Sequence, residues 1–146
     1  MSRLKMNEAF PESYKLLWEI DTQIKKAGIP PLYLELIKLR ASLLNGCAYC
    51  LNSHSADALK LGEDPKRIFV LNAWREASEW FSEEERTILR LTEEITQIGQ
   101  HGLSDEVYDK AVELFGEQKT GYLVMAAVNI NSWNRIGVGL NMHPTK

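Results

Sequence analysis

Residues 31–62 read PLYLELIKLRASLLNGCAYCLNSHSADALKLG, and they predict two helices separated by a sharp turn. Leucines in the first half recur at intervals of three and four residues, which places them on one stripe of a helix: Leu32, Leu36, Leu39 and Leu43. Asn45 and Gly46 end this helix, because both residue types tolerate turn conformations that others avoid. The second helix is predicted from near Cys47 to Gly62, since glycine is favoured just past a helix end.

Similar helix signals continue on both sides of this stretch. Prolines, glycines and capping residues predict further helices over about 11–28, over a short segment from about 64, and over about 82–99, 104–116 and 118–140. Strand signals are nearly absent. The sequence therefore predicts an all-α fold, a single-domain bundle of about six helices over residues 1–146 with no linker or repeat.

The composition argues against several classes of partner. Hydrophobic residues make up 45% of the chain and the formal net charge is −3, so the chain is expected to fold and to bind no nucleic acid. No apolar stretch approaches the roughly 20 residues of a membrane span, so no membrane partner is expected. The N-terminus lacks the apolar core of a signal peptide, which favours a cytoplasmic location.

The two cysteines, Cys47 and Cys50, form a C-x-x-C motif followed by His54. A reducing compartment disfavours a merely structural bridge, and so short a loop removes little entropy from the unfolded chain. On a helix, residues three and four apart share a face, so the three side chains line one side. A helix start favours the thiolate, and a histidine one turn away can accept or return a proton. The pattern therefore favours a redox-active pair assisted by His54.

Other readings of the motif are weaker. A zinc site normally needs four ligands, and only three stand together here. Covalent haem attachment uses C-x-x-C-H, but Leu51 stands at the histidine position. A thioredoxin-like domain would place the motif in a βαβ unit, whereas both flanks here are helical. Two ordinary buried cysteines remain the structural alternative. We expect no metal and no cofactor.

The motif residues resemble those of a known family. Glu35 followed by CAYCLNSH at residues 47–54 is similar to the signature of the AhpD-like alkylhydroperoxidases, which belong to the carboxymuconolactone decarboxylase superfamily. Residues 36–46 and 131–135 are also similar to family segments, so the resemblance spans most of the chain.

The resemblance implies an all-helical homo-oligomer, commonly a trimer or hexamer, that reduces hydroperoxides with a dithiol. It makes Cys50 the peroxidatic sulfur and Cys47 the resolving one. His54 and Glu35 would form the proton relay that activates Cys50. The resemblance also implies a thiol reductant, which in the alkylhydroperoxidase proper is a lipoylated partner protein.

Tyr49 departs from the founding enzyme, which has a histidine immediately before the second cysteine. A phenol, with a pKa of about 10, is a poor proton acceptor at neutral pH, although it can donate a hydrogen bond. The decarboxylase branch lacks this cysteine pair, which argues against decarboxylation. Three hypotheses stay open: a hydroperoxide reductase, a general thiol–disulfide oxidoreductase or redox sensor, and a non-catalytic helical oligomeric binding module.

Overall fold

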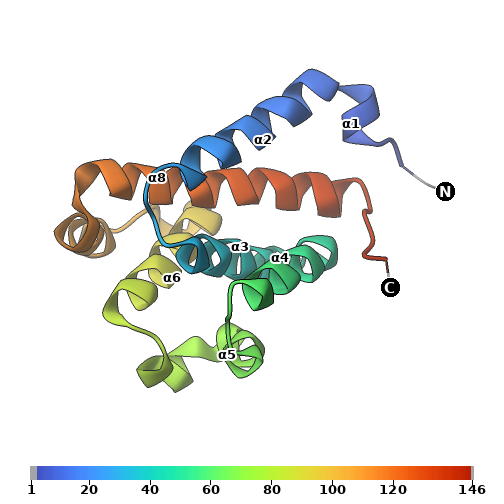
Figure 1. Cartoon of the computed structure of the whole chain (residues 1–146). Helices are drawn as coiled ribbons and strands as arrows, with labels where there is room; N and C mark the ends of the chain where they lie inside the picture. The colour runs from blue at the N-terminus through green and yellow to red at the C-terminus, as the bar shows by residue number, and fades with distance from the viewer. Residues whose placement is uncertain (1–2, 146) are drawn as a thin grey trace.

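The computed structural model describes residues 3–145, and every regular element among them is helical (Figure 1). In chain order these are α1 (Met6–Ala9), α2 (Pro11–Lys25), α3 (Pro31–Asn45), α4 (Ala48–Lys60), α5 (Pro65–Val70), the 3-10 helix η1 (Leu71–Trp80), α6 (Glu83–Thr96), α7 (Ile98–His101) and α8 (Asp105–Gly139). The predicted all-α fold is confirmed. None of the described helices has both the length and the apolar character needed to cross a membrane.

Helix α3 lies at the centre of the bundle, in contact with α4, α6 and α8. Its residues 34–42 are all buried, so the helix is covered around its whole circumference rather than along one stripe. Helix α2 runs alongside the last part of α8, and both ends of the chain emerge on the same side of the molecule (Figure 1). Buried apolar side chains of α3, α6 and α8 form the main core, among them Ile37, Ala41, Ile88, Leu91, Leu123 and Ile130.

Several helix ends lie where the sequence predicts them. Helix α3 ends at Asn45, and Gly46 has φ of 65°, a left-handed conformation that glycine adopts without strain. The helical geometry of α8 is interrupted at Gly116, where φ is 79°, so the predicted boundary between two helices is confirmed. The helix predicted over 82–99 ends earlier, at Thr96. Helices α1, α7 and η1 are not predicted, because segments this short carry little periodicity.

A buried carboxylate on α6 joins three elements. Glu93 Oε1 accepts hydrogen bonds from Arg40 Nε of α3 at 2.9 Å and from Trp74 Nε1 of η1 at 2.7 Å. Its other oxygen, Oε2, accepts from Arg75 Nη2 at 2.6 Å. Burial raises the pKa of Glu93, but the donors Arg75, Trp74 and Arg40 outweigh it and lower the pKa below its ordinary value. Glu93 is therefore ionised and holds η1 and α6 against α3.

Replacing this carboxylate should destabilise the fold. We expect Glu93→Gln to lower the free energy of unfolding by about 3 kcal/mol, because breaking a buried ion pair leaves the partner charge, here Arg40, without compensation. Urea denaturation measures the change. Glu113→Gln is the control, since Glu113 forms an exposed pair with Lys110 that should contribute less than about 1 kcal/mol. Equal losses in the two variants would contradict this account.

Candidate redox site

The turn between α3 and α4 places both cysteines at a helix start. Cys47 is the N-cap of α4, and its Sγ accepts a hydrogen bond from the Cys50 backbone N–H at 3.3 Å. The two residues form a disulfide, with their Cα atoms 5.3 Å apart. Both are buried, Cys47 at 1% exposure and Cys50 at 5%. The free N–H groups and the positive dipole end of the helix favour a thiolate at this position.

His54 and Glu35 form a hydrogen-bonded pair beside the cysteines. His54 follows Cys50 by one turn of α4, and its Nδ1 lies 3.0 Å from Oε2 of Glu35 on α3. Burial raises the pKa of the Glu35 carboxyl, but the hydrogen bond with His54 and the charge of Lys38 outweigh it and lower the pKa below its ordinary value. Glu35 is therefore an ionised acceptor facing the imidazole. The structure thus brings together all four residues that the sequence predicts: Cys47, Cys50, His54 and Glu35.

Charged side chains of α2 and α3 continue from Glu35 toward the surface. Lys38 Nζ lies 3.3 Å from Glu35 Oε1 and 2.9 Å from Asp21 Oδ1. Lys25 Nζ contacts the other oxygen of Asp21 at 2.8 Å. Burial raises the pKa of Asp21, but the two lysines outweigh it and lower the pKa. Asp21 and Lys38 are not among the residues that the sequence predicts for the site, because charged residues in a helix are ordinarily on the surface.

A pocket of about 140 Å³ is lined by Cys50 and His54. Apolar and aromatic side chains form much of its wall, among them Tyr14, Trp18, Ile24, Leu34, Ile130 and Trp133. The ring of Trp133 lies 4.8 Å from that of Tyr14 and 5.3 Å from that of Trp18, measured between centroids. Cys47 does not line this pocket, so Cys50 is the sulfur that the pocket reaches.

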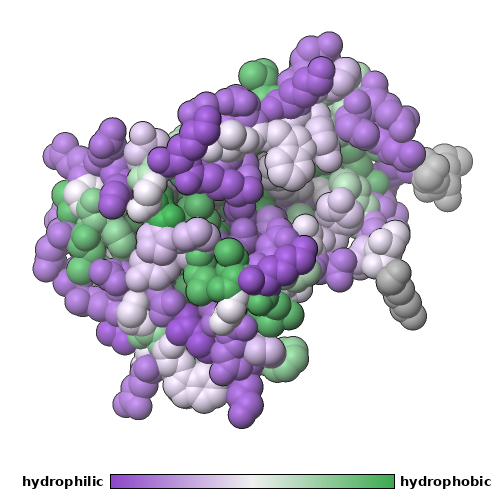
Figure 2. Space-filling model, in the orientation of Figure 1, coloured by the Kyte–Doolittle hydropathy of each residue, from purple (hydrophilic) through white to green (hydrophobic). Residues whose placement is uncertain are grey.

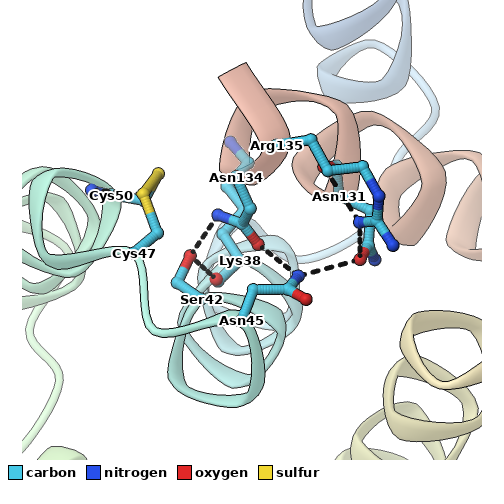
Figure 3. The surroundings of a disulfide bond; sticks show 8 residues. All are labelled: Lys38, Ser42, Asn45, Cys47, Cys50, Asn131, Asn134 and Arg135. Carbon is cyan, nitrogen blue, oxygen red and sulfur yellow. Dashed lines mark hydrogen bonds between the residues drawn. A yellow bond between two sulfur atoms is a disulfide. The ribbon is translucent and has the colours of Figure 1, made fainter. Parts of the chain in front are cut away.

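Side-chain amides fix the turn that precedes the cysteines (Figure 3). Asn45 Nδ2 donates to Oδ1 of Asn131 at 2.9 Å and to Oδ1 of Asn134 at 3.0 Å. Asn134 in turn donates to Ser42 Oγ at 2.9 Å, and the Ser42 hydroxyl donates to the Lys38 carbonyl at 2.6 Å. These bonds join the end of α3 to α8, and they hold the turn from which Cys47 emerges.

Gly137 of α8 is a site residue that the sequence analysis does not select. A Cβ atom at this position would lie 2.9 Å from Cys47 Sγ and 3.6 Å from Cys50 Sγ. The backbone of α8 therefore forms the wall behind the disulfide, and a Cβ atom at this position would force the Cys47 sulfur to shift. No local signal marks Gly137, because the contact joins segments far apart in the chain.

Two further residues lie close to the predicted set. Tyr49 lines the pocket and is 42% exposed. One potential metal-binding atom from each of Glu35, His54 and Asp57 lies within 4.8 Å of the others, a grouping that could hold a cation. This grouping differs from the cysteine-containing set weighed in the sequence, and Lys38 already neutralises Glu35 within it.

Comparison with known proteins places this site in a family. Residues 11–94 match the model of the carboxymuconolactone decarboxylase family. An uncharacterised Bacillus subtilis protein, YdfG, is 38% identical over 94% of this chain and 93% of its own length. A protein of unknown function from Agrobacterium tumefaciens, described provisionally as the antioxidant defence protein AhpD, shares 31% identity over the whole of both chains with a TM-score of 0.93. An uncharacterised peroxidase-related protein from Ralstonia eutropha, described as an alkylhydroperoxidase AhpD core, shares the fold: its TM-score is 0.81 at 13% identity, over 97% of this chain and 75% of that one.

Adding a methyl group behind the disulfide should disfavour oxidation. The disulfide holds the Cys47 sulfur 2.9 Å from where the alanine Cβ would lie. In the reduced protein the Cys47 side chain is no longer bonded to Cys50, so we expect it to move away from this Cβ by a change of rotamer. We expect Gly137→Ala to lower the equilibrium constant for disulfide formation about tenfold, which corresponds to about 1.4 kcal/mol. Titration against a dithiol redox buffer measures it. Gly139→Ala is the control, because a Cβ there meets nothing within 4 Å. Identical constants for wild type and both variants would contradict the expectation.

Proposed function

The chain belongs to the carboxymuconolactone decarboxylase family, and on that premise we propose that it is a thiol-dependent peroxidase that reduces hydroperoxides. The supporting observation is that Cys50 and His54 line one pocket while Glu35 is buried against His54. A nucleophile, a base and a group that orients the base are thus arranged in order. The description of the Agrobacterium relative as an antioxidant defence protein supports the same class of reaction.

His54 is the proposed base of the cycle. An ionised carboxylate only accepts hydrogen bonds, so neutral His54 donates to Glu35 through Nδ1–H. The other ring nitrogen, Nε2, is then unprotonated and can take the proton of the Cys50 thiol one helical turn away. Glu35 stabilises the imidazolium that results. Together the two residues form the proposed proton relay.

The reduction then takes two steps. Cys50 thiolate attacks the terminal oxygen of the hydroperoxide, so that an S–O bond forms and the O–O bond breaks. His54 returns its proton to the leaving alkoxide, which gives an alcohol and a sulfenic acid on Cys50. The Cys47 sulfur then attacks the Cys50 sulfur, and the hydroxyl group leaves with the Cys47 proton as water. In sum, two thiols and one hydroperoxide give a disulfide, an alcohol and water.

The burial of the disulfide supports a particular route of reduction. The pocket reaches Cys50, whereas Cys47 is 1% exposed and packs against Gly137. An incoming thiolate would attack Cys50, and Cys47 would leave as a thiolate stabilised by the Cys50 N–H. A pocket of about 140 Å³ favours a slender dithiol. We therefore propose a small dithiol, or the lipoyl arm of a partner protein, as reductant.

A general thiol–disulfide oxidoreductase or redox sensor is the second candidate. Tyr49 lines the pocket where the founding enzyme has a histidine, so one proton-transfer group of that enzyme is missing here. Thiol–disulfide exchange needs only the thiolate and an accessible sulfur. Turnover on a hydroperoxide compared with turnover on a small disulfide separates the two candidates. For a non-catalytic binding module, Cys50→Ser would leave the biological activity intact.

The cysteine variants test the peroxidase cycle. We expect one equivalent of hydroperoxide to convert the reduced wild type to the Cys47–Cys50 disulfide, detected by mass spectrometry. Cys47→Ser should stop at the sulfenic acid on Cys50, and Cys50→Ser should not react, because it lacks the attacking sulfur. With dihydrolipoamide as reductant, turnover should occur in wild type and disappear in both variants. Wild type that stays reduced in the presence of hydroperoxide would rule out this function.

We also propose that the protein forms a homo-oligomer, a trimer or hexamer. Apolar side chains gather near the centre of the face in Figure 2, close to the C-terminal end of α4 in Figure 1. Elsewhere, Leu16 is 65% exposed and Phe69 is 83% exposed. Apolar surface of this kind favours association. Light scattering at micromolar concentration should give a multiple of the 16.7 kDa chain mass. A monomeric mass would contradict the proposal.

A further inference from the structure

Helix α3 buries a lysine between two carboxylates beside the redox site. Lys38 Nζ lies 3.3 Å from Glu35 Oε1 and 2.9 Å from Asp21 Oδ1. We propose that Lys38, held by Asp21, is a positioning residue that keeps the Glu35 carboxylate ionised and so selects the tautomer of His54 that can accept a proton. The catalytic meaning of this inference rests on the proposed peroxidase function. The contacts of Lys38 with Glu35 and Asp21 are present before any peroxide binds.

The burial of the three charges makes each dependent on the others. The side chains of Glu35, Lys38 and Asp21 are only 8%, 9% and 10% exposed. Burial raises the pKa of a carboxyl group that has no nearby cation, because the ionised form has lost its water. Lys38 supplies that cation to Glu35. Asp21 keeps it there, because a lysine with a free ammonium group tends to extend toward water.

The protonation state of Glu35 decides which nitrogen of His54 carries the proton. An ionised Glu35 accepts from Nδ1–H, which leaves Nε2 free to accept the Cys50 proton. A protonated Glu35 can donate its O–H to Nδ1 instead. Neutral His54 then carries its proton on Nε2 and is no longer a base for Cys50. Removal of the Lys38 charge therefore acts on Cys50 through two residues, Glu35 and His54.

Other charged and titratable groups surround this pair. From α2, Lys25 contacts Asp21 at 2.8 Å, and both line the pocket together with Tyr14. From α4, Asp57 lies beside Glu35 and His54, but its side chain is 48% exposed, so water and salt screen its charge. Tyr49 and Cys50 of α4 line the same pocket. From α8 the lining includes Asn129, which is uncharged. Among the described lysines, Lys38 is the one that contacts Glu35.

A matched pair of lysine variants tests the inference. In a Cys47→Ser background, the rate of Cys50 alkylation by iodoacetamide is measured against pH for Lys38→Met and Lys38→Arg. Besides the hydrogen bond with His54, the charge of Lys38 lowers the pKa of Glu35, so loss of Lys38 raises that pKa. As the pH falls, Glu35 then takes up its proton at a higher pH, and Nε2 of His54 stops accepting the Cys50 proton at that higher pH. We expect Lys38→Met to move the acid side of the profile up by about one pH unit or more, as for a lost opposite charge at this distance. Lys38→Arg should stay close to the parent.

Lys110→Met is the control for a general loss of charge. It removes a lysine that pairs with Glu83 and Glu113 and does not line this pocket, and it leaves both bonds of Glu35 in place, so its profile should match the parent. Coincident profiles for Lys38→Met and Lys38→Arg would overturn the inference.

A second measurement does not depend on whether the variants fold. Nitrogen-15 NMR of the reduced wild type at mildly alkaline pH should show His54 protonated at Nδ1 and unprotonated at Nε2. The opposite tautomer would overturn the inference. Neither experiment uses peroxide. A shifted alkylation profile in a protein that does not consume hydroperoxide would refute the peroxidase and leave the role of Lys38 standing.

Discussion

An ionised side chain inside a protein needs a partner, and α3 buries three ionised side chains. Each partner comes from a different element: Glu35 pairs with His54 of α4, Lys38 with Asp21 of α2, and Arg40 with Glu93 of α6. Apolar packing alone tolerates small rotations of a helix, because one methyl group can replace another in a contact. Charged hydrogen bonds have fixed directions, so these pairs set the rotation of α3 and the register of its neighbours. The need to pair these three buried charges therefore helps to determine how the bundle is arranged.

The same requirement connects the core to the chemistry. The helix that organises the bundle also supplies Glu35, and the turn at its end delivers Cys47 to the start of α4. A cysteine pair needs little more than a helix start, an access route and a proton acceptor to become reactive. The fold itself is shared with distant proteins, as the TM-score of 0.81 at 13% identity shows. The bundle therefore does not define the reaction, which depends on the side chains at this site.

Local spacing explains what the sequence could predict. Cys47, Cys50 and His54 are separated by three and four residues, and helical periodicity alone places them on one face. Gly46 and Gly116 mark helix breaks because their backbone conformations favour glycine. These features depend on near neighbours in the chain, so they can be read without knowing the fold. Glu35 is different: in an apolar helix it resembles a surface carboxylate, and only the family resemblance singled it out. Lys38 follows Glu35 by three residues, but its second partner, Asp21, lies on α2, and Gly137 contacts the cysteines of a distant segment. No pattern within one helix reveals these two long-range contacts.

The disulfide has two unlike sides. Behind Cys47 is the main chain of α8 at Gly137, which has no rotamers and moves only when the helix moves. On the side of Cys50, the rings of Tyr14, Trp18 and Trp133 can turn, and Trp18 is 52% exposed. The two sulfurs are farther apart when reduced than in the disulfide. Because the backbone at Gly137 cannot yield, we expect this displacement to occur on the pocket side of Cys50. In the proposed cycle, the pocket wall beside Cys50 is therefore the part of the site that would adjust when the disulfide opens or closes.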